Sequence, residues 1–208
     1  MSITAKDVNE LRKKTGAGMM DCKKALTESN GDMEGAIDFL RKKGQKIAAK
    51  RGDRDAREGL VISKSHNENG YLVCLNCETD FVAKNDDFGA FANSLVDLAM
   101  QSESNTLEDL LNQKYANSEL TVTEKISEQS GVIGEKIEIS AFEKITATKV
   151  VAYNHPGNQI ATIVGLSLDE EEVGKQVAMQ VAAMNPIALD QDSVTQDVID
   201  REIEVGKD

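Results

Sequence analysis

One order of elements occurs twice in this chain, and this repeat limits the folds open to it. In the first copy, apolar runs at residues 60–62 and 71–75 are separated by Asn67-Glu68-Asn69-Gly70, a sequence typical of a hairpin turn. A stretch with apolar residues at helical spacing follows, and it contains Phe88, Phe91, Leu95, Leu98 and Ala99.

The second copy has the same order in the last third of the chain. Apolar runs at 149–153 and 160–164 enclose a turn at 154–157, and a helical stretch follows around 177–183. The repeat predicts an α+β core of two related antiparallel sheet-and-helix subdomains.

The two copies differ in length at one place. Residues 71–77 align with 160–166 at an offset of 89, whereas residues 94–103 align with 177–186 at an offset of 83. Six extra residues therefore lie between the second strand and the helix of the first copy, within 78–87. Because connecting segments on a rigid scaffold commonly carry function, this segment is a candidate functional site.

The first 50 residues predict a bundle of three short helices. Thr4 is placed to cap the first helix, with Asp7 in the capping-box position. This helix is expected to end near Lys14, because Gly16 and Gly18 follow.

The next two helices follow closely. Met19 and Met20 are expected in a short turn, and a second helix is expected from about Asp21 to Asn30-Gly31. Asp32 is then placed to cap a third helix.

Residues 42–57 predict a charged, partly helical linker that tethers this bundle, because they are rich in Lys, Arg, Asp and Gly. Residues 1–57 carry 14 Lys and Arg against 9 Asp and Glu, a charge of +5, whereas 58–208 carry 10 against 27, a charge of −17. The acidic part repels phosphate backbones, and the chain has no Trp and 4% aromatic residues. We therefore expect a protein partner and no direct nucleic-acid binding.

The remaining composition limits the cellular setting. No apolar run approaches the ~20 residues of a membrane span, and the N-terminus lacks the apolar region of a secretory signal, so we expect no membrane partner and a cytoplasmic location. The cysteines are odd in number, and their one C-x-x-C pair has no second pair, which predicts reduced thiols at Cys22, Cys74 and Cys77.

An enzymatic interpretation would rest on Cys77 with His66 or His155 as its base. Both histidines lie in predicted turns and no motif places them beside the thiol. Residues 16–18 lack the pattern of a phosphate-binding loop, and the acidic run 169–172 lacks EF-hand spacing and precedes a helix. We expect no enzymatic activity, no metal and no cofactor.

The segment Thr79-Asp80-Phe81-Val82 has two interpretations. In the first, Thr79 or Asp80 caps a helix and Phe81 enters the core. In the second, Phe81 stands out on a rigid turn with the Asp80 carboxylate beside it and acts as a wedge on a partner. The residues alone leave both open.

Two segments carry a family resemblance. LRKKTGAGMMDCKKAL at residues 11–26 resembles the N-terminal signature of elongation factor Ts, and NCETDFVAK at 76–84 resembles its second signature. Weaker similarity continues through Tyr153 to Gly157 and through 179–183, so the resemblance spans nearly the whole chain. On these residues the chain is identified as a member of this family.

The resemblance implies a guanine nucleotide exchange factor of translation elongation, a protein of protein biosynthesis that is not an enzyme. Its partner would be elongation factor Tu, in the GDP-bound and nucleotide-free states. Asp80 and Phe81 match residues that push between helices of Tu and dislodge its Mg²⁺ ion. Other matching positions imply docking on Tu by Arg12, Met19, Met20 and Lys23 and, on a different domain of Tu, by Gln180.

The resemblance also implies a division of the chain. A docking domain similar to ubiquitin-associated domains would comprise residues 1–50, and a linker 51–58. The first core subdomain, with the TDFV turn, would comprise 59–140 and the second 141–208. Because family members usually continue into a helical hairpin and a C-terminal segment, we expect a chain truncated at Asp208, within the start of that hairpin.

Two departures from the family concern folding contacts more than exchange. Cys74 replaces an acidic residue usual in the second signature, and Ser140 and Ala141 replace arginines. A competing hypothesis is a plain binding module, in which a helical domain is attached to an unrelated α+β body with another partner.

Overall fold

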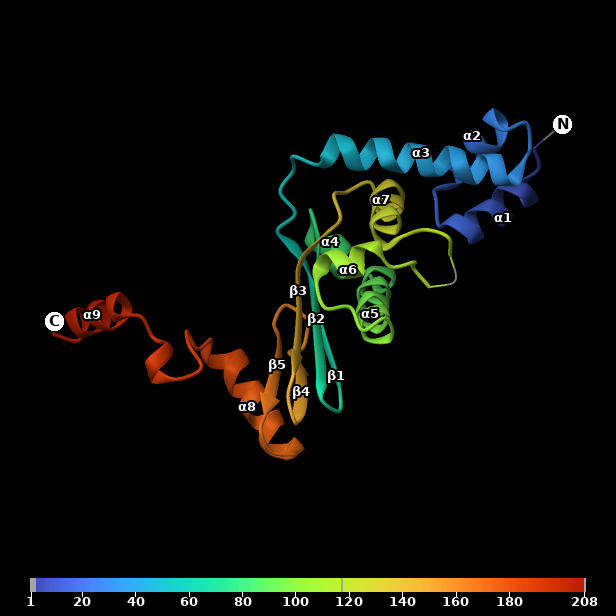
Figure 1. Ribbon diagram of the computed structural model, residues 1–208. Helices are drawn as coiled ribbons and strands as arrows, with labels where there is room; N and C mark the ends of the chain where they lie inside the picture. The colour runs from blue at the N-terminus through green and yellow to red at the C-terminus, as the bar shows by residue number, and fades with distance from the viewer. Residues whose placement is uncertain (1–2, 117, 208) are drawn as a thin grey trace.

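The computed structural model describes residues 3–116 and 118–207, and it confirms the α+β class (Figure 1). The N-terminal helices are α1 (Ala5–Thr15), α2 (Met19–Glu28) and α3 (Met33–Arg51). The first sheet and the helices on it are β1 (Glu58–His66), β2 (Asn69–Cys77), α4 (Asp80–Ala83), α5 (Asp86–Gln101), α6 (Leu107–Asn112), α7 (Val122–Ile133) and β3 (Glu138–Thr146). The rest are β4 (Lys149–Asn154), β5 (Ala161–Leu166), α8 (Glu171–Met184), the 3₁₀ helix η1 (Gln191–Ser193) and α9 (Gln196–Val205).

The predicted three-helix bundle is present, and its first helix has the predicted ends. The Thr4 hydroxyl accepts a hydrogen bond from the Asp7 amide, and the Asp7 carboxylate accepts one from the Thr4 amide at 2.9 Å. Gly16 ends α1 with a φ of +70°. The expected turn at Met19 and Met20 is wrong, because α2 begins at Met19 with Gly18 as its N-cap.

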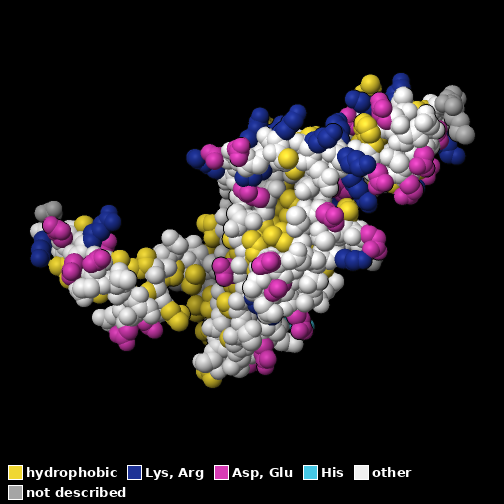
Figure 2. All heavy atoms as spheres, turned by 45° about the horizontal axis from the view of Figure 1, so that its top comes forward, with side chains coloured by type: hydrophobic (Ala, Val, Ile, Leu, Met, Phe, Trp, Pro, Cys, Tyr) yellow, Lys and Arg dark blue, Asp and Glu magenta, His cyan; other side chains and the backbone are white. Residues whose placement is uncertain are grey.

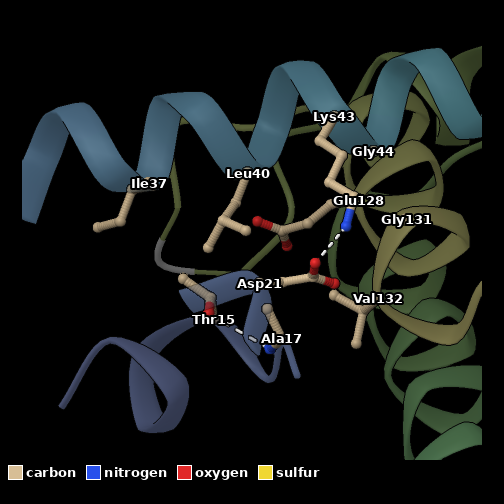
Figure 3. Close-up of a pocket in the computed structure, with 10 residues that line it drawn as sticks. All are labelled: Thr15, Ala17, Asp21, Ile37, Leu40, Lys43, Gly44, Glu128, Gly131 and Val132. Carbon is tan, nitrogen blue, oxygen red and sulfur yellow. Dashed lines mark hydrogen bonds and ion pairs between the residues drawn. The ribbon is translucent and has the colours of Figure 1, made fainter. Parts of the chain in front are cut away.

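The linker predicted at residues 42–57 is partly helical, as expected, but the expected loose tether is wrong, because its helical part is packed. Helix α3 continues to Arg51 and crosses α7, so the bundle is packed on the rest of the chain (Figure 1). Gly44 of α3 is buried against α7, where a Cβ at Gly131 would lie 2.3 Å from the Gly44 Cα (Figure 3). An ion pair between Lys43 of α3 and Asp21 of α2 lies beside this crossing.

This close crossing predicts that Gly131→Ala lowers the free energy of unfolding by about 1 kcal/mol. Alanine is favoured over glycine in a helix by up to ~1 kcal/mol, but overpacking a contact costs ~1–3 kcal/mol, and here the obstacle is backbone that cannot rotate away. Urea unfolding measures the change. Gly89→Ala in α5 is the matched control, since its Cβ would meet only Leu60 Cδ1 at 3.8 Å. A Gly131→Ala variant as stable as Gly89→Ala would contradict the prediction.

The first sheet is antiparallel with strand order β1-β2-β3. Strands β1 and β2 form the predicted hairpin around Asn67, which has a φ of +52°, and the predicted helix is α5. Helices α4 to α7 and the three strands enclose the largest core, whose fully buried members include Val73, Leu75, Leu95, Val96, Leu110 and Val122.

The second copy of the repeat is also present, as the hairpin β4-β5 followed by α8. Its sheet packs on β1, where the buried Ser63 donates its amide to the Asn154 side chain at 2.7 Å and its carbonyl accepts from the same side chain at 2.8 Å. The extra segment of the first copy contains α4, whereas β5 and α8 are joined by residues 167–170 without a helix.

The two departures from the family signatures lie opposite each other. Cys74 of β2 is the cross-strand partner of Ala141 of β3, and the Ser140 hydroxyl bonds the Asn76 side chain at 2.5 Å. An acidic residue directly opposite an arginine on paired strands would attract it, whereas a cysteine and an alanine lie opposite each other here.

Candidate functional site: the α4 turn

Helix α4 is a single turn that presents one large apolar side chain to solvent. Ala83 faces the core with 3% of its surface exposed, and Val82 packs partly against the core. The Phe81 side chain points away and is 84% exposed. Thr79 occupies the N-cap position, which agrees with the first interpretation of this segment. Phe81 lies in solvent and not in the core, which agrees with the second interpretation.

The start of this turn is held by a carboxylate from a distant part of the sequence. Glu135 lies between α7 and β3, and its Oε2 accepts hydrogen bonds from the amides of Glu78 and Thr79, each at 3.0 Å. Its Oε1 accepts from the Thr79 hydroxyl at 2.7 Å. The Thr79 side chain therefore bonds Glu135 and makes no capping bond to α4.

A second carboxylate makes the return contact. Glu78 Oε1 accepts a hydrogen bond from the Lys136 amide at 2.6 Å, and the same carboxylate pairs with Arg51 at 2.6 Å and Arg54 at 3.1 Å. Burial acts to raise the pKa of Glu78, but the hydrogen bonds from Lys136, Arg51 and Arg54 outweigh it and lower the pKa to about 2. The turn is thus tied to the end of α3 as well as to the segment before β3.

A charged pair lies beside Phe81. The Lys84 ammonium bonds the Asp80 carboxylate at 2.6 Å, and this bond and the Lys84 charge lower the pKa of Asp80. Asp80 is the first residue of α4, where the helix dipole also favours a negative charge. The exposed aromatic ring is therefore accompanied by an ionised carboxylate on a fixed turn.

A groove of about 690 Å³ lies on the bundle side of Phe81. It runs between the end of α1, the α4 turn, α5 and α7, and its walls are mostly apolar or aromatic. The side chains that line it include Lys14, Phe81, Phe88, Phe91, Tyr115 and Ile133.

The other predicted binding residues are exposed but are not gathered at this turn. Arg12 and Lys23 lie on the surface of α1 and α2, and the side chains of Met19 and Met20 are 58% and 76% exposed. Lys and Arg side chains gather along the edge that α3 forms (Figure 2). Gln180 lies on the exposed surface of α8, at the other end of the first sheet from α4 (Figure 1).

The sequence did not indicate the residues that hold the turn. Glu135 is 56 residues from Thr79, and Arg51 is 27 residues from Glu78, so no local spacing joins them. The one available signal was Gly134, which ends α7 with a φ of +82° and turns the next residue toward the sheet.

The described residues carry little that would suggest other chemistry. No helix in residues 3–116 and 118–207 is long and apolar enough to cross a membrane. Within the same ranges, no group of three or more His, Cys, Asp and Glu side chains could hold a metal ion. Cys22 and Cys77 are buried free thiols, and burial, followed by the nearby Glu135 carboxylate, raises the pKa of Cys77 to about 11.

Comparison with known proteins places this turn in a family context. The family model described as Elongation factor TS matches residues 78–208, a span that begins at the clamped Glu78. The Elongation factor Ts of Christiangramia forsetii is 54% identical over 99% of this chain and 76% of that protein. The chain belongs to the elongation factor Ts family. It is a translation elongation factor, with a role in protein biosynthesis.

Further members of the elongation factor Ts family match over the same extent. The Elongation factor Ts of Flavobacterium psychrophilum is 50% identical, and that of Amoebophilus asiaticus is 48% identical. Each match covers 100% of this chain and 76% of the relative. The family assignment therefore includes the N-terminal helices as well as the core.

Proposed function

We propose that this protein is a cytoplasmic guanine nucleotide exchange factor that binds elongation factor Tu in its GDP-bound form and promotes GDP release. The observation that carries the proposal is the exposed Phe81 on a turn that the carboxylates of Glu78 and Glu135 hold in place. An aromatic side chain that lies in solvent contributes little to folding, and it is suited to contact a partner. In this proposal Asp80 and Phe81 form the wedge, and Thr79 and Val82 anchor it to the chain.

The wedge acts on the magnesium ion of the partner. Mg²⁺ bridges phosphate oxygens and GTPase side chains in strict octahedral geometry, so a small displacement of its ligands weakens nucleotide binding steeply. Burying one Phe is worth ~1.5–3 kcal/mol, which at ~1.4 kcal/mol per tenfold corresponds to a roughly 10- to 100-fold weakening of nucleotide binding. A larger effect needs the docking contacts as well.

Thermodynamic linkage between GDP and this protein determines which complex with Tu has the higher affinity. Whatever factor this protein applies to the affinity of Tu for GDP, GDP applies to the affinity of Tu for this protein. The nucleotide-free complex is therefore the stable one, and a new nucleotide dissociates it.

The remaining contacts belong to docking. We assign residues 1–50 to a docking domain that presents Arg12, Met19, Met20 and Lys23 to the GTPase domain of Tu, followed by a linker at 51–58. The core subdomains would be 59–140, with the wedge, and 141–208, with Gln180 facing another domain of Tu. Methionine suits such a surface, since its flexible thioether adapts to an irregular apolar partner.

No chemical catalysis is part of this proposal. A thiol with a pKa of about 11 is protonated at neutral pH, so Cys77 is a poor nucleophile. The excess of acidic residues also disfavours direct nucleic-acid binding. The protein would act by binding alone.

Release of a fluorescent GDP analogue from purified elongation factor Tu tests the proposal. The expected result is a release rate that rises with the concentration of this protein to a plateau. A rate equal to the spontaneous one at every concentration would refute exchange and favour the plain binding module.

A further inference from the structure

We infer that Glu135 is a positioning residue for exchange, which holds the turn in the direction that presents Phe81; the inference rests on the proposed function. The hydrogen bonds of the Glu135 side chain go to Glu78 and Thr79 and not to Phe81, so Glu135 would act on Phe81 through these two residues. All three of its bonds, at 3.0, 3.0 and 2.7 Å, go to the two residues that precede α4.

These bonds fix the entry of the chain into α4. Strand β2 ends at Cys77, so the amides of Glu78 and Thr79 have no ladder partner and both point at Glu135 Oε2. With one turn, α4 is too short to hold its own direction, because a single hydrogen-bonded turn is marginal without tertiary support. The direction of Phe81 therefore depends on what holds residues 78 and 79.

Glu135 itself is held from two sides. Gly134 ends α7 in the left-handed region, and the Ser130 hydroxyl accepts a hydrogen bond from the Ile137 amide at 3.1 Å, which fixes the segment on either side of Glu135. The Lys136 amide in turn donates to Glu78 at 2.6 Å. Each carboxylate thus accepts from the backbone of the other segment, and the two segments cannot shift independently.

A reporter at the wedge can separate positioning from general stability. The chain has no Trp, so Phe81→Trp supplies a single tryptophan at an exposed position, which is excited selectively over the three tyrosines. In this background we expect Glu135→Ala to roughly double the fraction of the fluorescence anisotropy that decays on the nanosecond timescale of loop motion. Glu135→Gln should restore the wild-type decay, because an amide oxygen accepts both backbone bonds and the Thr79 hydroxyl can accept from the amide nitrogen.

Asp109→Ala is the matched control. Asp109 also accepts two backbone amides, from Asn105 at 3.1 Å and Thr106 at 3.0 Å, but it lies at the start of α6. It should leave the anisotropy at position 81 unchanged. An unchanged anisotropy in Glu135→Ala, or an equal change in Asp109→Ala, would overturn the inference.

The same substitutions in the native Phe81 background connect the turn to exchange. We expect Glu135→Ala to lower the plateau rate of GDP release about five- to tenfold, while the half-saturating concentration changes less than about twofold, because docking residues are untouched. Glu135→Gln should recover most of the rate. A loss confined to the half-saturating concentration would overturn the positioning role. Since the anisotropy needs no Tu, it decides whether Glu135 holds the turn even where the wild-type protein releases no GDP, a result that would refute the proposed function by itself.

Discussion

If the proposed exchange operates through Phe81, Phe81→Ala is expected to slow GDP release from elongation factor Tu by about 10- to 100-fold. The range follows from the ~1.5–3 kcal/mol that burial of one Phe side chain supplies, at ~1.4 kcal/mol per tenfold. The loss should fall on the plateau rate measured with a fluorescent GDP analogue. Binding should weaken less, because Arg12, Met19 and Met20 lie on other helices.

The folded state should tolerate this substitution. With 84% of Phe81 exposed, the alanine variant removes few packed contacts, and surface substitutions change stability by about 0.5 kcal/mol or less. Thermal unfolding should therefore give nearly the wild-type melting temperature. A large drop would instead mean that Phe81 packs in the core.

Leu189→Ala is a suitable control for the loss of an exposed apolar side chain. Leu189 is 97% exposed and lies between α8 and η1, far along the chain from α4. It should leave both the plateau rate and the melting temperature unchanged. If Phe81→Ala releases GDP as fast as Leu189→Ala, the wedge is wrong.

The helices were predictable where side chains mark their ends. Thr4, Asp7 and Asp32 cap backbone amides within three residues of themselves, so sequence spacing is enough to find them. The start of α2 was missed because Gly18 caps it without a side-chain bond. The length of α3 was missed because its second half is stabilised by packing on α7 through Gly44, and such a contact leaves no local pattern.

The location of the candidate site could be predicted from the sequence, but the direction of its main side chain could not. The register difference between the two repeats located the segment that contains α4, because a repeat compares a chain with itself. The exposure of Phe81 could not be decided, since the residues of 79–82 suit both a capped helix with Phe81 in the core and a rigid turn with Phe81 in solvent. The bonds of Glu135 to Glu78 and Thr79, to which we attribute the direction of Phe81, join segments 56 residues apart and leave no local pattern.

Glu78→Gln is expected to lower the free energy of unfolding by about 2 kcal/mol at pH 7. A carboxyl group whose pKa falls from 4.5 to about 2 gains roughly 3 kcal/mol at most, and solvent at the exposed Arg54 screens part of this. The amide oxygen can still accept from Arg51 and the Lys136 amide, but the NH2 group then turns a donor toward Arg54, which loses its acceptor. Urea unfolding measures the difference between the two proteins.

The difference should depend on pH in one direction. Because folding lowers the pKa of Glu78, its contribution is complete above about pH 4.5 and is lost as the pH falls toward 2. The gap between wild type and Glu78→Gln should therefore be constant from pH 7 to 5 and then shrink toward acid, by up to ~1.4 kcal/mol per pH unit.

Glu10→Gln supplies the comparison for this pH dependence. Glu10 pairs with Lys14 at 3.4 Å on α1, but its side chain is half exposed, and exposed pairs of this kind contribute little. Its stability should follow the wild-type curve at every pH. If the Glu78→Gln gap stays constant down to pH 3, the clamp on Glu78 does not stabilise the charged carboxylate, and the turn that carries Phe81 must be held by Glu135 alone.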